Sequence, residues 1–260
     1  MNGLKIAIGG KGGVGKTTIC AFLAQIFAED GFDVLAIDAD PNTTLAMAFG
    51  IKADKNPEPL INMKKLIEER TDTKLDSIGS YFKMNPKVSD LPEKYWLKIN
   101  NIKLLVLGAI THGGSGCACP EGAFLKAMLR HIILQRQELA LIDLAAGVEF
   151  LGRASIMGTD MLILIVEPGG RSIQTANNMA EMAKELGIKH VTAIANKITK
   201  PAQVDLIQDQ LKNITLIGQL DFSEHLIEAD IMRKDVFSSD QKVLKQLKDA
   251  KLHLEKILTE

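Results

Sequence analysis

The sequence is short of the residues and runs that mark secreted or membrane-spanning proteins. Only three of its 260 residues are cysteines. This small, odd number does not build a disulfide framework, and it favours a reducing compartment in which thiols stay free. No apolar run approaches the roughly 18 residues needed to cross a bilayer, and the strand-like residues 4–9 are too few for the apolar part of an export signal. We therefore expect a cytoplasmic protein with no membrane span.

An excess of charge of one sign is also lacking. The chain carries 31 basic and 32 acidic residues, which leaves a formal net charge of −1. Without a positive field or a visible basic patch, binding to the phosphate backbone of nucleic acid is not expected. Hydrophobic residues make up 46% of the chain and charged residues 24%. This balance supports a sizeable core and excludes a disordered chain.

Short apolar runs alternate with helix-length segments along most of the chain. Strand-like runs occupy residues 4–9, 34–38, 103–108, 139–143, 161–166, 191–196 and 215–220. Helical patterns occupy residues 17–29, 121–136, 172–186, 202–211 and 241–258. Because each crossover between parallel strands needs a helix that packs over the sheet, the alternation predicts an α/β fold, a doubly wound and mostly parallel sheet flanked by helices. We expect one domain over residues 1–260, with a less regular insertion at about residues 52–101.

The strongest motif is a glycine-rich loop at residues 10–17, which matches G-x-x-x-x-G-K-[ST] between an apolar run and a helical one. Glycines let backbone N–H groups wrap a triphosphate without obstruction from Cβ atoms, and the following helix adds its positive end. Lys16 is expected to neutralise the β and γ phosphates, and the Thr17 hydroxyl to ligate Mg²⁺. The residues expected to line the triphosphate are Gly12, Gly13, Val14, Gly15, Lys16, Thr17 and Thr18.

A dinucleotide-binding turn is the alternative interpretation of this loop. Gly10, Gly12 and Gly15 also match G-x-G-x-x-G, and an acid, Asp38, ends the next strand-like run. The two residues after the last glycine decide against it. A dinucleotide site continues there into an apolar helix face, whereas a triphosphate needs a cation and a Mg²⁺ ligand.

Acidic residues follow two of the expected strands. Asp38 and Asp40 come at the end of the second strand, at the edge where ligands bind in open α/β folds. One can position the attacking water and the other can support the Mg²⁺ shell. The pair Asp40-Pro41 is also a common turn signal, which is the alternative, structural role. Asp143 ends another apolar run and is expected to hold Mg²⁺ through water.

The base is predicted from residues 195–199. Guanine-specific P-loop proteins carry Asn-Lys-x-Asp here, and the aspartate accepts hydrogen bonds from guanine. In this sequence Asn196 and Lys197 are followed by Thr199 in the position of that aspartate, so adenine is favoured. We expect Asn196 and Lys197 to line the nucleotide, and the turn after the last strand, near Leu220, to close over the adenine ring.

Cys117 and Cys119 lie on a glycine-rich segment immediately before an expected helix. Pro120 and the positive helix end predict lowered thiol pKa values. Two sulfurs offer only two ligands to one ion, whereas Zn²⁺ or Ni²⁺ usually takes four, so a two-fold dimer is expected to combine the pairs of two chains on its axis. The alternative for Cys117 and Cys119 is that their thiols only fill apolar space, and this is the role assigned to Cys20 on the first helix.

The loop at residues 10–18 resembles the deviant Walker A loop of the superfamily that contains MinD, ParA, the nitrogenase iron protein and CooC. Lys11 matches the signature lysine of that superfamily, which implies that it reaches across a dimer interface to the partner's nucleotide. The resemblance also implies that Asp40 orients the attacking water and that Asn196 contacts the adenine edge. Catalytic roles are therefore expected for Lys11, Lys16 and Asp40.

Within this superfamily, the Cys-x-Cys loop resembles that of the CooC family, which matures nickel enzymes. Residues 145–153 are similar to the CooC switch II segment and residues 166–176 to its next strand and helix, although Leu144 and Ala145 depart from the usual pattern. The resemblance implies a homodimer that hydrolyses Mg·ATP to ADP and shares a Ni²⁺ or Zn²⁺ site, with carbon monoxide dehydrogenase or acetyl-CoA synthase as its client. The alternatives are a positioning ATPase of the ParA or MinD type that binds DNA or membrane, and an iron-sulfur carrier like the nitrogenase iron protein.

Overall fold

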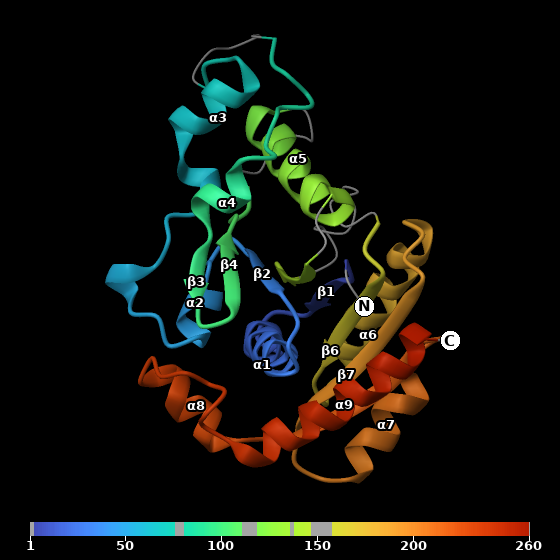
Figure 1. Ribbon diagram of the computed structural model, residues 1–260. Helices are drawn as coiled ribbons and strands as arrows, with labels where there is room; N and C mark the ends of the chain where they lie inside the picture. The colour runs from blue at the N-terminus through green and yellow to red at the C-terminus, as the bar shows by residue number, and fades with distance from the viewer. Residues whose placement is uncertain (1–2, 76–80, 111–118, 136–137, 147–157, 260) are drawn as a thin grey trace.

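The computed structural model describes residues 3–75, 81–110, 119–135, 138–146 and 158–259. In these ranges the chain forms one eight-stranded sheet with helices on both of its faces (Figure 1). The strands are β1 Lys5–Gly10, β2 Val34–Ala39, β3 Leu97–Ile99, β4 Ile102–Val106, β5 Leu139–Leu144, β6 Met161–Val166, β7 His190–Ile198 and β8 Thr215–Asp221. Their order across the sheet is β3-β4-β2-β5-β1-β6-β7-β8.

The sheet is parallel except at one edge, where β3 pairs antiparallel with β4. Every residue of the four central strands β1, β2, β5 and β6 is buried. Burial on both faces explains why these strands are continuous apolar runs and do not alternate between apolar and polar residues. The doubly wound, mostly parallel sheet predicted from the sequence is confirmed.

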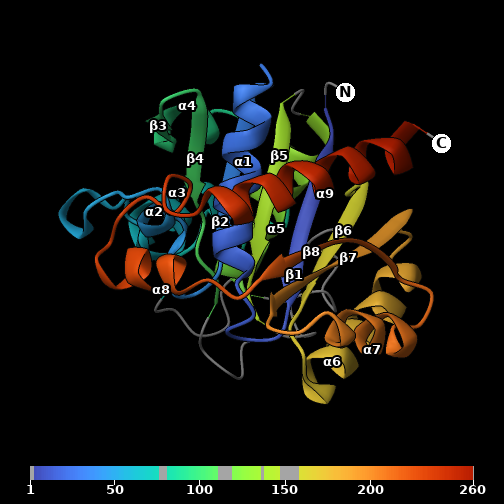
Figure 2. The same ribbon diagram turned by 90° about the horizontal axis from the view of Figure 1, so that it is seen from below.

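Helices pack on each face of the sheet through a separate apolar cluster. The helices of the described ranges are α1 Lys16–Glu29, α2 Leu45–Ala48, α3 Lys64–Thr71, α4 Leu91–Tyr95, α5 Pro120–Gln135, α6 Gly170–Glu185, α7 Ala202–Gln210, α8 Glu224–Ile231 and α9 Gln241–Thr259. One cluster joins α1 and α9 to the sheet through Phe22, Phe27 and Leu247, and these helices cross the same face in Figure 2. The other cluster joins α5 and α6 through Phe124 and Met179.

The insertion expected at about residues 52–101 contains α3, α4 and β3. The helical patterns and strand-like runs of the sequence do not include β3 or the short helices α2, α3, α4 and α8, because elements of three to eight residues carry too little periodicity to stand out. Among the described residues, no helix combines the length and the apolar character needed to cross a bilayer.

Candidate nucleotide site

The glycine-rich loop lies between β1 and α1, at the carboxyl edge of the parallel strands. Gly13 has a left-handed φ of +79°, and a Cβ atom built there would have open space around it within 4 Å. Gly15 has φ +98°, and its Cβ would lie 2.5 Å from Nδ2 of Asn196. The left-handed φ favours glycine at both positions. At Gly15 the missing Cβ also allows the close approach of Asn196 from β7.

Lys16 is the first residue of α1, and its side chain is largely buried. Its Nζ donates to the carbonyl oxygen of Lys11 at 3.3 Å. Burial lowers the pKa of Lys16, while the negative charges of Asp143 and Asp40 act in the opposite direction. A partly desolvated cation thus lies beside the loop, which is what a bound triphosphate requires.

Asp143 and Thr17 face each other beside this cation. The Thr17 hydroxyl donates to Oδ2 of Asp143 at 2.7 Å. Burial raises the pKa of Asp143 to about 7, against the lowering effect of the Thr17 hydrogen bond. Its Oδ1 is buried and has no hydrogen-bond partner in the described part of the chain. An orphaned carboxylate oxygen next to a hydroxyl fits Mg²⁺ with its water shell, because Mg²⁺ binds proteins through few carboxylates and keeps several waters.

Asp38 lies opposite Asp143 in the register of β2 and β5. It is fully buried, and burial raises its pKa to about 6. Its Oδ1 accepts from the Asp40 N–H at 3.1 Å, and its Oδ2 accepts from the Leu45 N–H at 2.9 Å. Both carboxylate oxygens are therefore engaged by the loop between β2 and α2, and Asp38 positions Asp40.

Asp40 is half-buried in the same loop. Its Oδ1 accepts from the backbone N–H of Asn42 at 2.8 Å and from Nδ2 of that residue at 3.1 Å. Asp40 thus closes the turn that the aspartate-proline pair predicts.

The last residue of α2, Ala48, is held by the segment between α8 and α9. Its carbonyl oxygen accepts a hydrogen bond from the Val236 N–H at 3.2 Å.

The end of β7 supports the glycine loop from outside. Nδ2 of Asn196 donates to the Val14 carbonyl oxygen at 2.8 Å, and Nζ of Lys197 donates to the Gly13 carbonyl oxygen at 2.6 Å. Oδ1 of Asn196 accepts from the Lys197 N–H at 2.9 Å. Lys197 has a left-handed φ of +59°, an uncommon conformation for a residue with a Cβ atom. Two successive loop carbonyls are therefore bound by side chains of β7.

Glu167 directly follows β6 and links two lysines at this edge. Its Oε1 lies 3.2 Å from Nζ of Lys11, and its Oε2 lies 3.4 Å from Nζ of Lys197. In the sequence, Glu167 stands out only as part of residues 166–176, the segment similar to CooC, and no role is expected for it. The sequence does carry a signal for Glu167, because it is an acid directly after an apolar strand, and the same feature identifies Asp143.

The structure brings most of the predicted nucleotide residues to this edge, and Thr18 follows in the first turn of α1. Leu220 differs from the others. It is 1% exposed and belongs to the apolar cluster that contains α1 and α9. Its side chain therefore packs inside the protein, and closure of the following turn over adenine stays a prediction.

The cysteine segment is described only in part. Cys119 is half-buried, and its Sγ accepts from the Gly122 N–H at 3.2 Å. The predicted lowering of its pKa is wrong, because burial raises the pKa of the Cys119 thiol and the Gly122 hydrogen bond offsets this only in part. Cys117 and residues 147–153 of the expected switch II lie outside the described residues. Within the described ranges, no group of three or more His, Cys, Asp or Glu could hold a metal, and Cys20 is buried, as expected of a filler.

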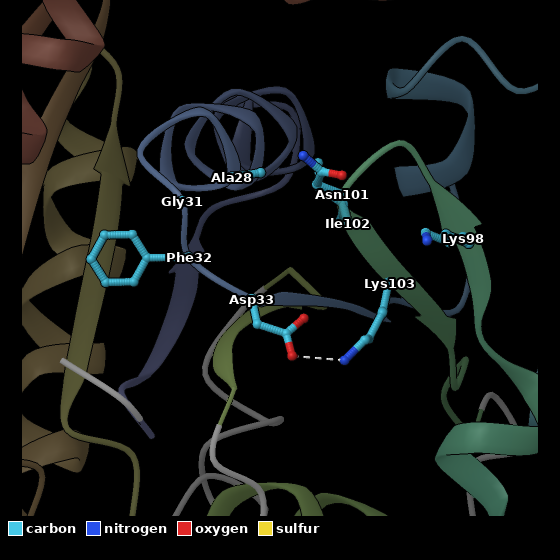
Figure 3. A pocket seen from close by; sticks show the side chains of 8 residues that line it. All are labelled: Ala28, Gly31, Phe32, Asp33, Lys98, Asn101, Ile102 and Lys103. Carbon is cyan, nitrogen blue, oxygen red and sulfur yellow. Dashed lines mark hydrogen bonds and ion pairs between the residues drawn. The ribbon is translucent and has the colours of Figure 1, made fainter.

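A hollow of about 290 Å³ lies at the opposite, amino-terminal edge of the strands (Figure 3). Nζ of Lys103 pairs there with Oδ2 of Asp33 at 2.8 Å and with Oε1 of Glu138 at 3.4 Å. The same ammonium lies 4.7 Å from the centre of the Trp96 ring. The charge of Lys103 is therefore balanced within the protein.

Similarity to known proteins agrees with this geometry. Residues 5–236 match the family described as the CobQ/CobB/MinD/ParA nucleotide binding domain. The chain is similar to the carbon monoxide dehydrogenase accessory protein CooC of Rhodospirillum rubrum, with 43% identity over 229 residues that cover 87% of each chain. It is also similar to an uncharacterized ATP-binding protein of Methanocaldococcus jannaschii, with 41% identity over 247 residues, 94% of this chain and 95% of the relative.

Solved structures of MinD share the fold. The MinC:MinD cell division protein complex of Aquifex aeolicus gives a TM-score of 0.70 at 20% identity, covering 99% of this chain and 96% of the other. The septum site-determining protein MinD of Pyrococcus horikoshii, complexed with Mg-ADP, gives a TM-score of 0.69 at 17% identity, covering 97% of this chain and 96% of the other. At these identities the likeness concerns the fold alone, and it confirms a sheet and helices arranged as in MinD.

Proposed function

The chain belongs to the CobQ/CobB/MinD/ParA nucleotide-binding family, and on that premise we propose that it is a homodimeric ATPase that supplies nickel to carbon monoxide dehydrogenase or acetyl-CoA synthase. The observation that carries the proposal is the 43% identity with CooC over most of the chain. The hydrolytic part is supported by the hydrogen bond from Thr17 to Asp143 of β5, beside Lys16 and the glycine loop.

The loop is suited to hold the triphosphate of ATP with its charge met by Lys16 and by backbone N–H groups. Thr17 and Asp143 are the residues to hold Mg²⁺, which when bound supplies charge neutralisation across the β and γ phosphates. Asp40 is proposed to orient the attacking water. Asp38 keeps Asp40 in place through the Asp40 N–H.

Lys11 is proposed to complete the nucleotide site of the partner subunit. It lies on the loop itself with 40% of its side chain exposed, so it is accessible to a second chain. Adenine is proposed to lie against Asn196 and Lys197. One N–H of the Asn196 amide is left for the base, because the other is used by Val14 and the amide oxygen by Lys197.

Nickel is the proposed cargo. Cys117 and Cys119 offer two sulfurs per chain, and two chains related by a two-fold axis offer four. Because burial raises the pKa of the Cys119 thiol, the free protein holds this sulfur protonated at neutral pH. A metal binds the thiolate, so binding must release protons and the affinity should rise with pH.

An anaerobic titration with Ni²⁺ tests the proposal. The protein is titrated with and without Mg²⁺ and a non-hydrolysable ATP analogue, while metal content and sedimentation are followed. We expect one ion per two chains and tighter binding in one nucleotide state. By linkage, the ion should then promote the dimer in that same state.

Two cysteine variants make the titration specific. Cys117→Ser combined with Cys119→Ser should lose both the ion and the metal-dependent dimer. Cys20→Ala removes the remaining, buried thiol and should keep both. One tightly bound ion per monomer, indifferent to adenine nucleotide, would contradict the proposal.

A further inference from the structure

The proposed dimer requires Lys11 to reach another subunit, yet within this chain Lys11 is already paired. Its Nζ lies 3.2 Å from Oε1 of Glu167. The other oxygen of this carboxylate lies 3.4 Å from Nζ of Lys197, which also donates to the Gly13 carbonyl oxygen at 2.6 Å. The Glu167 carboxylate thus connects Lys11 to Lys197 at the end of β7. Lys197 in turn binds the glycine loop on which Lys11 lies.

The carboxylate is the better fixed member of the pair. Glu167 directly follows β6, and its N–H donates to the hydroxyl oxygen of Ser172 near the start of α6 at 3.1 Å. Its second carboxylate oxygen is held by Lys197. Lys11, in contrast, needs only to swing its flexible side chain. The lysine is therefore the member that can change partners.

The strength of the pair suits a reversible contact. The side chain of Lys11 is 40% exposed and that of Glu167 is 24% exposed. Ion pairs that remain open to solvent contribute little to stability, because water and salt screen them. A triphosphate carries several negative charges, so a nucleotide presented by a second chain can compete with one carboxylate for this ammonium.

We propose that Glu167 is an autoinhibitory latch that holds Lys11 within its own subunit until a nucleotide-loaded partner draws the lysine across. The inference rests on the proposed ATP-dependent dimer and adds to it the group that opposes dimer formation. Closing a symmetric dimer breaks two such ion pairs, one in each chain. Removing the negative charge of Glu167 should therefore tighten the dimer.

Sedimentation velocity in Mg²⁺ and a non-hydrolysable ATP analogue measures the dimer dissociation constant. Glu167→Gln keeps the size of the side chain and removes its charge, while Glu181→Gln makes the same change at an exposed position of α6. We expect Glu167→Gln to lower the dissociation constant by roughly three- to tenfold, and Glu181→Gln to change it by less than about twofold. The gain should shrink as salt screens the ion pair of the wild type.

The outcomes separate the latch from the proposed function. If the wild type dimerises and Glu167→Gln has an equal or higher dissociation constant, the latch is overturned and the dimeric ATPase stands. If neither protein dimerises with the analogue, the dimeric function fails and the latch fails with it. A variant that dimerises where the wild type stays monomeric supports the latch directly.

Discussion

The two edges of the sheet differ in whether their charged side chains have partners of opposite charge. At the carboxyl edge, Asp38 and Asp143 lie opposite each other on neighbouring strands, and burial raises their pKa values to about 6 and about 7. At the amino edge, Lys103 pairs with Asp33 at 2.8 Å (Figure 3) and also with Glu138 at 3.4 Å. One edge holds acids whose negative charge is unfavourable in the free protein, and the other holds a balanced cluster.

This difference indicates which edge of the sheet is suited to bind a ligand. A buried carboxylate with a raised pKa gains when a cation arrives, because the cation favours its ionised form. A lysine that already has two carboxylate partners gains little from a further anion. The cluster around Lys103 therefore serves the fold, whereas the carboxyl edge is suited to Mg²⁺ and phosphate.

Replacing one lysine at each edge should give the largest contrast. Lys16→Met keeps the apolar stem and removes the ammonium beside the glycine loop, so it should slow ATP hydrolysis by about 10²- to 10³-fold. Lys103→Met acts at the far edge and should leave the rate within about twofold. Steady-state phosphate release measures both rates. A large loss of hydrolysis in Lys103→Met would break the distinction between the edges.

Asp143→Asn should separate stability from function. The pKa of Asp143 is about 7 in the folded protein against an ordinary value of 3.8. Between these values the folded state binds a proton that the unfolded state has lost, so the free energy of unfolding falls as pH rises through this window. Asparagine cannot ionise, so the variant does not lose this stability as the pH rises. Near pH 8 the nucleotide-free variant should be more stable than the wild type by about 2 to 4 kcal/mol.

Denaturant unfolding at about pH 8 and about pH 4 checks this sign. The advantage of asparagine should vanish at the acid pH, where the wild-type carboxyl is largely protonated in the folded state, and ATP hydrolysis should be lost in the variant. Asp33→Asn is the control at the amino edge. It removes a partner of Lys103 and should not stabilise the protein. A variant at position 143 that is less stable than wild type near pH 8 would show that the protein itself compensates the ionised Asp143.

Asn196→Ala tests the support that β7 gives to the glycine loop. It removes the donor to the Val14 carbonyl oxygen, and the loss of one such hydrogen bond should weaken ATP binding by about five- to tenfold. Asn101→Ala is the control, because Asn101 lines the hollow at the amino edge. Titration calorimetry with ATP measures both affinities. Unchanged binding in Asn196→Ala would mean that the loop keeps its shape without the hydrogen bond from Asn196.

The smallest effect is expected for the stability of Lys103→Met. Its ammonium is only partly buried, so loss of the ion pairs and of the contact with Trp96 should cost about 1 kcal/mol or less. Trp96 is the only tryptophan of the chain, and its fluorescence should therefore change in Lys103→Met and stay unchanged in Lys16→Met. A fluorescence change in both variants would argue that the two edges are coupled.

The central strands and the glycine loop could be predicted because their signals are local. Continuous apolar runs mark strands buried on both faces, and the spacing of glycines before Lys16 marks the loop. Asp38 and Asp143 are each expected at the carboxyl end of a strand, the edge where ligands bind in open α/β folds. The structure adds that β2 and β5 are neighbours and that the two carboxylates lie opposite each other.

Contacts between distant parts of the chain could not be predicted in this way. Asn196 reaches Val14 across 182 residues, and Lys11 reaches Glu167 across 156. No periodic pattern records such pairs. The predicted sign of the Cys119 pKa shift is wrong for a similar reason, because the helix end is visible in the sequence and the burial of the sulfur is not.

The short helix α2 has a neighbour at each end. Its first residue, Leu45, is bound by Asp38 beside the glycine loop, and its last residue, Ala48, accepts a hydrogen bond from Val236 ahead of the C-terminal helix. These two hydrogen bonds connect the loop after β2, which carries Asp38 and Asp40, to the segment between α8 and α9 through the four residues of α2. If the chain is the proposed ATPase, a partner that binds the segment between α8 and α9 would therefore change the affinity for nucleotide, and nucleotide would change the affinity for that partner by the same factor.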